Sequence, residues 1–186
     1  MSEALALIEL SSIARGYQVA DAVVKRAPVA LRECRPVSPG KFLVLFDGDV
    51  ASVDESFRRG LEVAGDRLVD KLFLPQAHAQ LGPAVRGQAS ARAGAGVAVE
   101  SYAVVETLTV AATLLAADAA AKAAAVRVVE MQLARGIGGK AFFALSGALA
   151  EIEAAVEAAV TVADRALVVG TEIIPAPHED LIARLP

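Results

Sequence analysis

The 186-residue chain has few aromatic residues, one cysteine and no tryptophan, and these shortages exclude several classes of protein. Aromatic residues make up 4% of the chain and apolar residues 55%, so a core must be built from alanine, valine, leucine and isoleucine. That apolar content also excludes an intrinsically disordered chain, because disordered chains have too little apolar surface to collapse. One cysteine, Cys34, excludes an intramolecular disulfide framework. With two histidines, His78 and His178, it cannot form a four-ligand zinc site of the usual type within one chain.

Charge and hydropathy narrow the class further. The net charge is −4 and the isoelectric point about 5.3, which argues against a protein that binds nucleic acid by neutralising phosphates. The most apolar stretch, 104–129, is interrupted by Glu106, Asp118 and Lys122 and does not predict a membrane-spanning helix. The first residues lack a basic region followed by an apolar core, so no secretory signal is predicted. We expect a soluble cytoplasmic protein with neither nucleic acid nor membrane as a partner.

The chain contains an internal duplication. Residues 5–34 align with residues 102–131 at a constant offset of 97, and ten of the thirty positions are identical. Five of these identities are alanines, which prove little in an alanine-rich chain. The other five are mostly charged residues that recur in register: Glu9/Glu106, Asp21/Asp118, Lys25/Lys122, Val29/Val126 and Glu33/Glu130. Composition does not explain charged residues that recur in register, so we infer two copies of one unit.

The match extends to the end of each half. After a two-residue insertion, Gly40-Lys41 aligns with Gly139-Lys140, and a further one-residue shift aligns His78 with His178. Between the halves, residues 80–96 are rich in glycine, alanine and proline and show no hydrophobic period, which predicts a linker. We expect a first domain over 1–80, a linker over 81–97 and a second domain over 98–186.

Each half shows the same order of predicted elements. In the first half, strands are predicted over 4–10, 29–35, 41–47 and 68–74, with a turn over 36–40. Two helices are predicted from apolar residues at helical spacing: Ala20, Val23, Val24 and Ala27, and then Val50, Val53, Phe57, Leu61 and Ala64. Asp49 is a suitable N-cap for the second helix, whose counterpart is expected over 149–164. The order is βαββαβ twice, so we expect an α/β (α+β) chain of two tandem ferredoxin-like domains with mainly antiparallel sheets.

These motifs resemble a bacterial microcompartment shell protein of the unpermuted tandem-domain type, with two fused shell domains. The resemblance covers residues 4–80 and 98–181. In the first half it rests on AxIEL, ADAVVKRA, the glycine-containing turn before a hydrophobic strand, FDGDV and the Pro-x-x-His end. In the second half it rests on AVVET, AADAAAKAA, ARGIGGKAFF and IIPAPH. Each motif alone is short, and their recurrence in the right order makes the match strong.

The resemblance implies a structural role without a cofactor. Tandem members form homotrimers in which six domains make a pseudohexameric tile. Tiles join other shell proteins edge to edge around a metabolic enzyme core, which leaves encapsulated enzymes open as partners and implies a location in a microcompartment shell in the cytoplasm.

The resemblance also implies a central pore for small metabolites. In the family the turn between the second and third strands lines it: here Ser38, Pro39 and Gly40 in the first half, and Gly136, Ile137, Gly138 and Gly139 in the second. The first turn departs from the usual glycine-rich form, so three of the six sectors should differ from the others. Lys41 and Lys140 follow the turns and would favour anionic metabolites if their ammonium groups faced the pore.

The first helix of each half carries an i, i+4 ion pair, Asp21 with Lys25 and Asp118 with Lys122. The residues alone indicate a solvated helix pair worth about 0.3–0.5 kcal/mol. In the family the lysine lies along the tile edge against its counterpart in the next tile. The resemblance therefore implies edge contacts for these four residues together with His78 and His178.

The other candidate functional sites in the sequence have weaker support. Cys34 lies on a predicted strand, where we expect a small buried hydrophobe. Some tandem members hold an iron–sulfur cluster through a turn cysteine, and since both turns here lack cysteine we predict no cluster. The segment around Lys140 is not a phosphate-binding loop, because it lacks the first glycine of that motif and has Ala141 in place of the hydroxyl residue after the lysine. Glu9 and Glu106 are expected to be satisfied sheet carboxylates. We expect no catalytic residue, no metal site and no enzyme activity.

One alternative of a different class stays open on fold analogy alone. Ferredoxin-like trimers also bind small metabolites between subunits, so the chain could be a regulatory small-molecule-binding protein. That alternative predicts ligand-dependent thermal stabilisation and no assembly into tiles.

Overall fold

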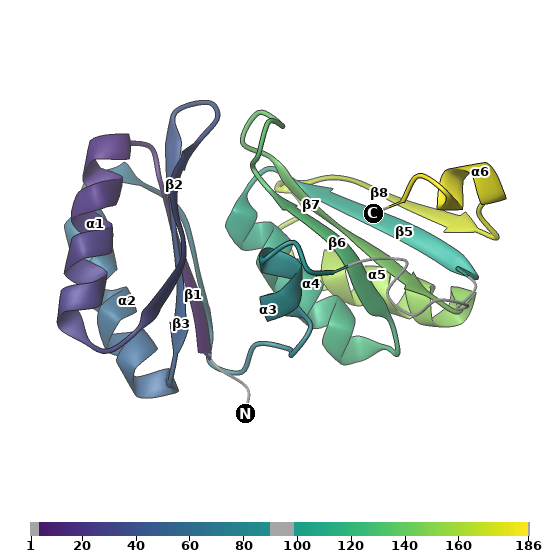
Figure 1. Ribbon diagram of the computed structural model, residues 1–186, viewed down its shortest axis with the longest axis horizontal. Helices are drawn as coiled ribbons and strands as arrows, with labels where there is room; N and C mark the ends of the chain where they lie inside the picture. The colour runs from purple at the N-terminus through teal and green to yellow at the C-terminus, as the bar shows by residue number, and fades with distance from the viewer. Residues whose placement is uncertain (1–3, 90–98, 186) are drawn as a thin grey trace. The chain divides into compact units, whose positions relative to one another are not determined.

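The structure is a computed structural model that describes residues 4–89 and 99–185 (Figure 1). The chain divides into two compact units, and each is described by itself below. The first unit contains the residues through Ala77 together with residues 134–139. The second contains residues 78–133 and the residues from Lys140 onward. The expected βαββαβ order is present in both halves.

The first unit is an antiparallel four-stranded sheet with two helices against one face (Figure 1). Its strand order is β2-β3-β1-β4. The elements are β1 (Ala4–Leu10), α1 (Ile13–Arg26), β2 (Ala30–Val37), β3 (Lys41–Gly48), α2 (Val50–Ala64), a 3-10 turn η1 (Gly65–Arg67) and β4 (Leu68–Leu74). As predicted, the Asp49 carboxylate accepts the backbone N–H of Ser52 at 3.0 Å and caps α2. The strands β1 and β4 have the predicted bounds.

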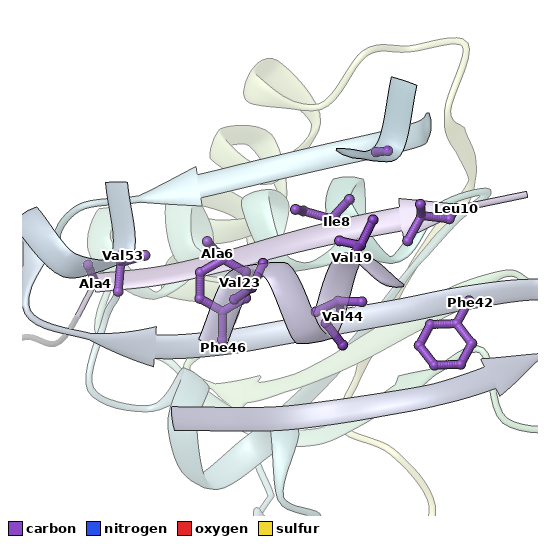
Figure 2. Packing of buried hydrophobic residues seen from close by; sticks show 12 residues of the cluster. Ala4, Ala6, Ile8, Leu10, Val19, Val23, Phe42, Val44, Phe46 and Val53 are labelled. Carbon is purple, nitrogen blue, oxygen red and sulfur yellow. The ribbon is translucent and has the colours of Figure 1, made fainter. Parts of the chain in front are cut away.

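Alternate residues of the two central strands form the core against the helices. Figure 2 shows β1 contributing Ala4, Ala6, Ile8 and Leu10, and β3 contributing Phe42, Val44 and Phe46. Helices α1 and α2 add Val19, Val23 and Val53. Every second residue of a strand faces the helices, and every third or fourth residue of a helix faces the sheet. These side chains together form one apolar layer.

The apolar stripe predicted on α1 is shifted by about one turn. Val24 is 42% exposed, and the residues that α1 buries are Gly16, Val19, Ala20 and Val23. A Cβ at position 16 would lie 2.2 Å from the Phe42 ring, so glycine permits the close approach of helix and sheet there. The prediction counted only apolar side chains and could not use a glycine. On α2 the first predicted stripe residue, Val50, is likewise 46% exposed.

The edge strand β2 also differs from expectation. It continues through Pro36 to Val37, so the turn begins at Ser38 and not at position 36. An edge strand tolerates a proline because its missing N–H removes no bond from the interior of the sheet. The prediction that Cys34 is a small buried hydrophobe is wrong, because its side chain is exposed on this strand.

The second unit repeats the sheet, with strand order β6-β7-β5-β8. Its elements are α3 (Leu81–Val85), β5 (Ser101–Thr107), α4 (Val110–Ala123), β6 (Arg127–Leu133), β7 (Ala141–Gly147), α5 (Leu149–Val162), β8 (Val168–Pro175) and α6 (Glu179–Ile182). Helix α3 lies inside the predicted linker 81–97, so the linker's first residues form an ordered element; residues 90–98 lie outside the described residues. The domain boundaries at 80 and 98 stay predictions.

A second cluster lies on the face of the β5 strand that carries Tyr102 and Val104. Tyr102 is 4% exposed and packs with Val99, Val129 and Ala144, and Ile182 of α6 packs against this cluster. Burial, and then the charge of Glu130, raises the pKa of Tyr102 from 10.0 to about 12. The Tyr102 hydroxyl also donates a hydrogen bond to the Glu130 carboxylate. None of the helices in the described ranges is long and apolar enough to cross a membrane.

The raised pKa of Tyr102 makes stability sensitive to alkali. Because the folded value of about 12 lies above 10.0, the folded chain keeps a proton that the unfolded chain loses between these pH values. The free energy of unfolding should therefore fall over that interval, by at most about 1.4 kcal/mol per pH unit. Denaturant unfolding of Tyr102→Phe across the same interval should show a shallower fall. Tyr17→Phe, at a tyrosine that is 58% exposed, should keep the wild-type slope, and equal slopes for all three proteins would contradict the assignment.

Candidate functional site

The two turns predicted to line a pore connect equivalent strands. Ser38, Pro39 and Gly40 join β2 to β3 and are all exposed. Residues 134–140 join β6 to β7, and there Gly136 and Gly138 are exposed while Gly139 is buried. Gly136, Gly138 and Gly139 have φ of +71°, +67° and +83°, which glycine adopts without strain. The second turn therefore needs its glycines for its backbone path.

Residues 134–139 group with the first unit, so the two turns belong to the same compact body. A Cβ at Gly139 would lie 2.6 Å from the Ser38 carbonyl oxygen, closer than side chains approach backbone. The Arg135 guanidinium lies 3.3 Å from a Glu33 carboxylate oxygen, and Arg35 binds the other oxygen of the same carboxylate. Glycine at position 139 is thus required both for its φ and for this close approach.

The lysine that follows each turn binds a glutamate of its own sheet. Lys41 Nζ lies 2.8 Å from Glu9 Oε1, and the Glu9 side chain is fully buried. The repeat-related pair, Lys140 and Glu106, has the same 2.8 Å distance, with Glu106 37% exposed. The expectation of two satisfied sheet carboxylates matches these contacts. Because each ammonium group is paired with a carboxylate, the two lysines do not present uncompensated positive charge beside the turns.

The two ion pairs on the first helices have different surroundings. Asp21 and Lys25 form a 2.8 Å pair with both side chains more than half exposed. Asp118 binds Lys122 in the same way, but the Asp118 carboxylate is buried and also accepts the backbone N–H of His78 at 2.7 Å. Through this hydrogen bond Asp118 holds the segment that follows β4 in place. Lys25 and Lys122 both keep exposed ammonium groups, with side chains 72% and 46% exposed.

The two repeat-related histidines accept hydrogen bonds from nearby backbone. His178 Nδ1 accepts the N–H of Asp180 at 3.2 Å at the start of α6, and His78 Nδ1 accepts that of Gln80 at a longer 3.4 Å. His178 is exposed and His78 half-buried. Among the described residues, no three His, Cys, Asp or Glu side chains come together in a way that could hold a metal ion.

Arg135, a charged residue of the second turn, was not predicted as a site residue from the sequence. Its side chain is 63% exposed and its partner Glu33 is 12% exposed. The recurrence of Glu33 as Glu130 was a signal that position 33 matters. A lone arginine in a glycine-rich turn gives no comparable signal, because its partner lies a hundred residues away in the chain.

Comparison with known proteins decides what these turns and helices belong to. The BMC domain matches this chain twice, over residues 4–77 and 101–177. The chain belongs to the BMC domain family. The bacterial microcompartment shell protein PduT of Citrobacter freundii is 40% identical over 182 residues, which cover 97% of this chain and 96% of that protein. The predicted duplication and resemblance are therefore confirmed, and the chain is a shell protein of a bacterial microcompartment.

Solved structures agree with this assignment. A microcompartments protein from Desulfitobacterium hafniense matches with a TM-score of 0.85 and 39% identity, covering 97% of this chain and 98% of that chain. The fused permuted hexameric shell protein MSM0275 from the RMM microcompartment matches with a TM-score of 0.62 at 22% identity, covering 86% and 80% of the two chains, and so supports the fold alone. The family is structural and not enzymatic. The comparisons give no support to the regulatory alternative.

The two turn lysines should differ in their effect on stability. Lys41→Met removes the cation that neutralises a fully buried carboxylate and should lower the free energy of unfolding by about 3–5 kcal/mol. Lys140→Met should cost at most about 1 kcal/mol, because water reaches Glu106. Denaturant unfolding measures both. The double variant Glu9→Gln with Lys41→Met should recover part of the loss, and equal losses for the two single variants would contradict the burial argument.

The turn glycines provide a second matched pair. Gly138→Ala should cost about 1–2 kcal/mol, because it forces alanine to a φ of +67° in otherwise open space. Gly139→Ala has the same strain and also places its Cβ against the Ser38 carbonyl, so its thermal midpoint should fall further. Calorimetry distinguishes them, and a Gly139→Ala protein at least as stable as Gly138→Ala would show that the turns separate freely.

Proposed function

We propose that this shell protein forms a homotrimer whose six domains make a pseudohexagonal tile with a central pore for small metabolites. The observation that supports it most is the double match to one domain family in a single chain, because three such chains supply six equivalent units. A ring of this kind brings equivalent turns together at its symmetry axis, where they have little room and must pack closely.

The proposed pore is lined by Ser38, Pro39 and Gly40 and by the second turn, Gly136, Ile137, Gly138 and Gly139. The exposure of the first three residues and of Gly136 and Gly138 supports this assignment. Turn backbone with residues at positive φ can form a concave surface of N–H groups, which would suit polar or anionic solutes. Since Lys41 and Lys140 are neutralised by glutamates, the charged side chain beside the opening is Arg135, which itself binds Glu33.

The proposed edge contacts between tiles depend on the two first-helix lysines. Lys25 and Lys122 are both exposed, and Asp21 and Asp118 bind their ammonium groups. His78 and His178 follow the last strand of each domain and complete the proposed edge. A single lysine contact is weak, but six per tile act together, so a modest energy supports an extended layer of shell proteins.

Electron microscopy of the purified protein tests this function directly. Hexagonal discs or sheets are expected at high protein concentration. A protein that stays monomeric at every concentration, and shows no discs, would contradict the tile.

Substitution of both edge lysines separates the edge from the ring. Lys25→Ala with Lys122→Ala should leave individual discs intact and reduce sheets several-fold, because lysine contacts join tiles and not chains within a tile. Arg58→Ala is the matched control for Lys25→Ala, since it breaks another i, i+4 ion pair with an exposed cation, on α2. Circular dichroism melting verifies that Lys122→Ala, which removes the cation beside the buried Asp118 carboxylate, keeps the fold. Sheets of wild-type extent from the double lysine variant would remove the edge assignment while leaving the disc in place.

A further inference from the structure

The first unit exposes an apolar surface whose repeat-related copy in the second unit is buried. On α1 and β2, Ile13, Tyr17, Val24 and Leu31 are 41%, 58%, 42% and 38% exposed. The residues at the same positions of α4 and β6 are Val110, Leu114, Ala121 and Val128, which are 0%, 0%, 7% and 6% exposed. Four matched positions that change together show one surface that is open in the first unit and covered in the second.

Part of the cover on the second unit is the segment that follows β4, His78 to Val85. The His78 N–H donates to Asp118 Oδ1 at 2.7 Å. The Gln80 side-chain amide donates to the Val126 carbonyl at 2.9 Å and accepts from the Val128 N–H at 2.8 Å, so it pairs with the end of β6 as a short strand would. Leu81 of α3 is fully buried, and α3 packs against both β6 and α4.

The same segment occurs a second time after β8, and there its outer face is open. His178, Asp180 and Leu181 occupy the positions of His78, Gln80 and Leu81. Leu181 is 39% exposed where Leu81 is fully buried, and the Asp180 side chain is 90% exposed. Ile182 and Leu185 pack on the segment's own sheet, which leaves Leu181 as its outward apolar residue.

The surface that would receive this segment is open in the first unit as well. Asp21, the counterpart of Asp118, has a side chain that is 58% exposed. Val29, just before β2, and Leu31 of β2 are the counterparts of Val126 and Val128. One chain therefore carries an open docking segment at its C-terminal end and an open docking surface on its first unit.

We propose that the segment His178–Leu181 of one chain docks on the α1 and β2 surface of a second copy of this chain. The His178 backbone N–H donates to the Asp21 carboxylate, and Leu181 covers the apolar surface formed by Tyr17, Val24 and Leu31. The contact is head to tail, because the segment and the surface lie on different units, and such a contact propagates around a ring until it closes. The inference rests on the proposed trimer and names the contact that closes it.

Position 180 makes the contact between chains differ from the one within a chain. The Gln80 amide both donates to and accepts from the edge strand. A carboxylate at position 180 only accepts, so Asp180 takes the N–H of Leu31 and leaves the Val29 carbonyl to water. The contact between chains thus relies on Asp21 and Leu181 more than its counterpart relies on Asp118 and Leu81.

Dilution of full-length variants tests the contact. Asp21→Ala and Leu181→Asp should each raise the trimer dissociation constant about tenfold or more, measured by mass photometry or sedimentation, since a charge-assisted hydrogen bond or a buried leucine is lost. Asp21→Asn, which keeps an acceptor oxygen, should have a smaller effect. Circular dichroism melting of each variant verifies the fold, and both substituted side chains are exposed in the single chain.

Two matched controls have the same chemistry at positions outside the proposed contact. Asp54→Ala breaks an i, i+4 pair with Arg58, and the counterpart of Asp54, Glu153, is exposed. Leu108→Asp changes a leucine that is 45% exposed and whose counterpart, Ser11, is also exposed. Both controls should keep the wild-type dissociation constant. Control variants whose trimer dissociation constants rise as much as those of the test variants would overturn the proposed site.

The outcomes separate the contact from the ring itself. A wild-type chain that is monomeric at all concentrations would contradict the proposed tile. A wild-type trimer that Asp21→Ala and Leu181→Asp leave unchanged would keep the tile and overturn this contact.

Mixing the two variants tests the head-to-tail geometry. The Asp21→Ala chain retains an intact segment and the Leu181→Asp chain an intact surface, so one good contact forms between unlike chains. Cross-linking and mass spectrometry of the mixture should yield heterodimers in excess over both homodimers. A mixture that behaves as the sum of its two components would overturn the pairing of segment with surface.

Discussion

The buried ion pair between the first strand and the lysine after the first turn is the contact on which the arrangement of the first domain depends. Glu9 lies on a central strand of its sheet, and its fully buried carboxylate binds Lys41 at 2.8 Å. A buried carboxylate is costly unless a cation lies beside it, so the first residue of β3 is held in a fixed position. The turn immediately before Lys41 therefore starts from a fixed base. The repeat-related pair, Glu106 and Lys140, has the same 2.8 Å distance, but water reaches Glu106, so this pair holds the base of the second turn less strongly.

The duplication permits one sequence pattern to serve two environments. Asp21 and Asp118 occupy equivalent positions on the first helix of each domain, and each binds the lysine four residues later in its own helix. One carboxylate is exposed, whereas the other is buried and holds a backbone N–H from the segment after β4. The first helices differ correspondingly: α1 exposes Tyr17 and Val24, and the helix α4 is buried on most of its surface and built mainly from alanine. The composition of each first helix therefore matches its surroundings: the exposed helix carries larger side chains, and the buried helix carries mainly alanine.

Much of the fold could be predicted from the sequence, because the repeat and the strand periodicity are local patterns. The βαββαβ order, the bounds of β1 and β4 and the Asp49 cap were all predictable. The errors have a common physical origin, which is that burial depends on neighbours far away in the chain. Val24 fits a helical stripe but faces away from the sheet, and Cys34 fits a buried strand residue but lies on an exposed edge. The ion-pair partners of Lys41 and Arg135 could not be predicted either, since each pair joins residues that are distant in sequence.

The unlike chemistry of the two turns bears on how an opening built from them would respond to a passing molecule. Proline at position 39 restricts its own backbone, whereas the glycines at 136 and 138 have nothing within 4 Å of where a Cβ would lie. In the proposed ring, rigid and pliable sectors would alternate around the perimeter. Any change in the width of the proposed opening would then come from three of its six sectors.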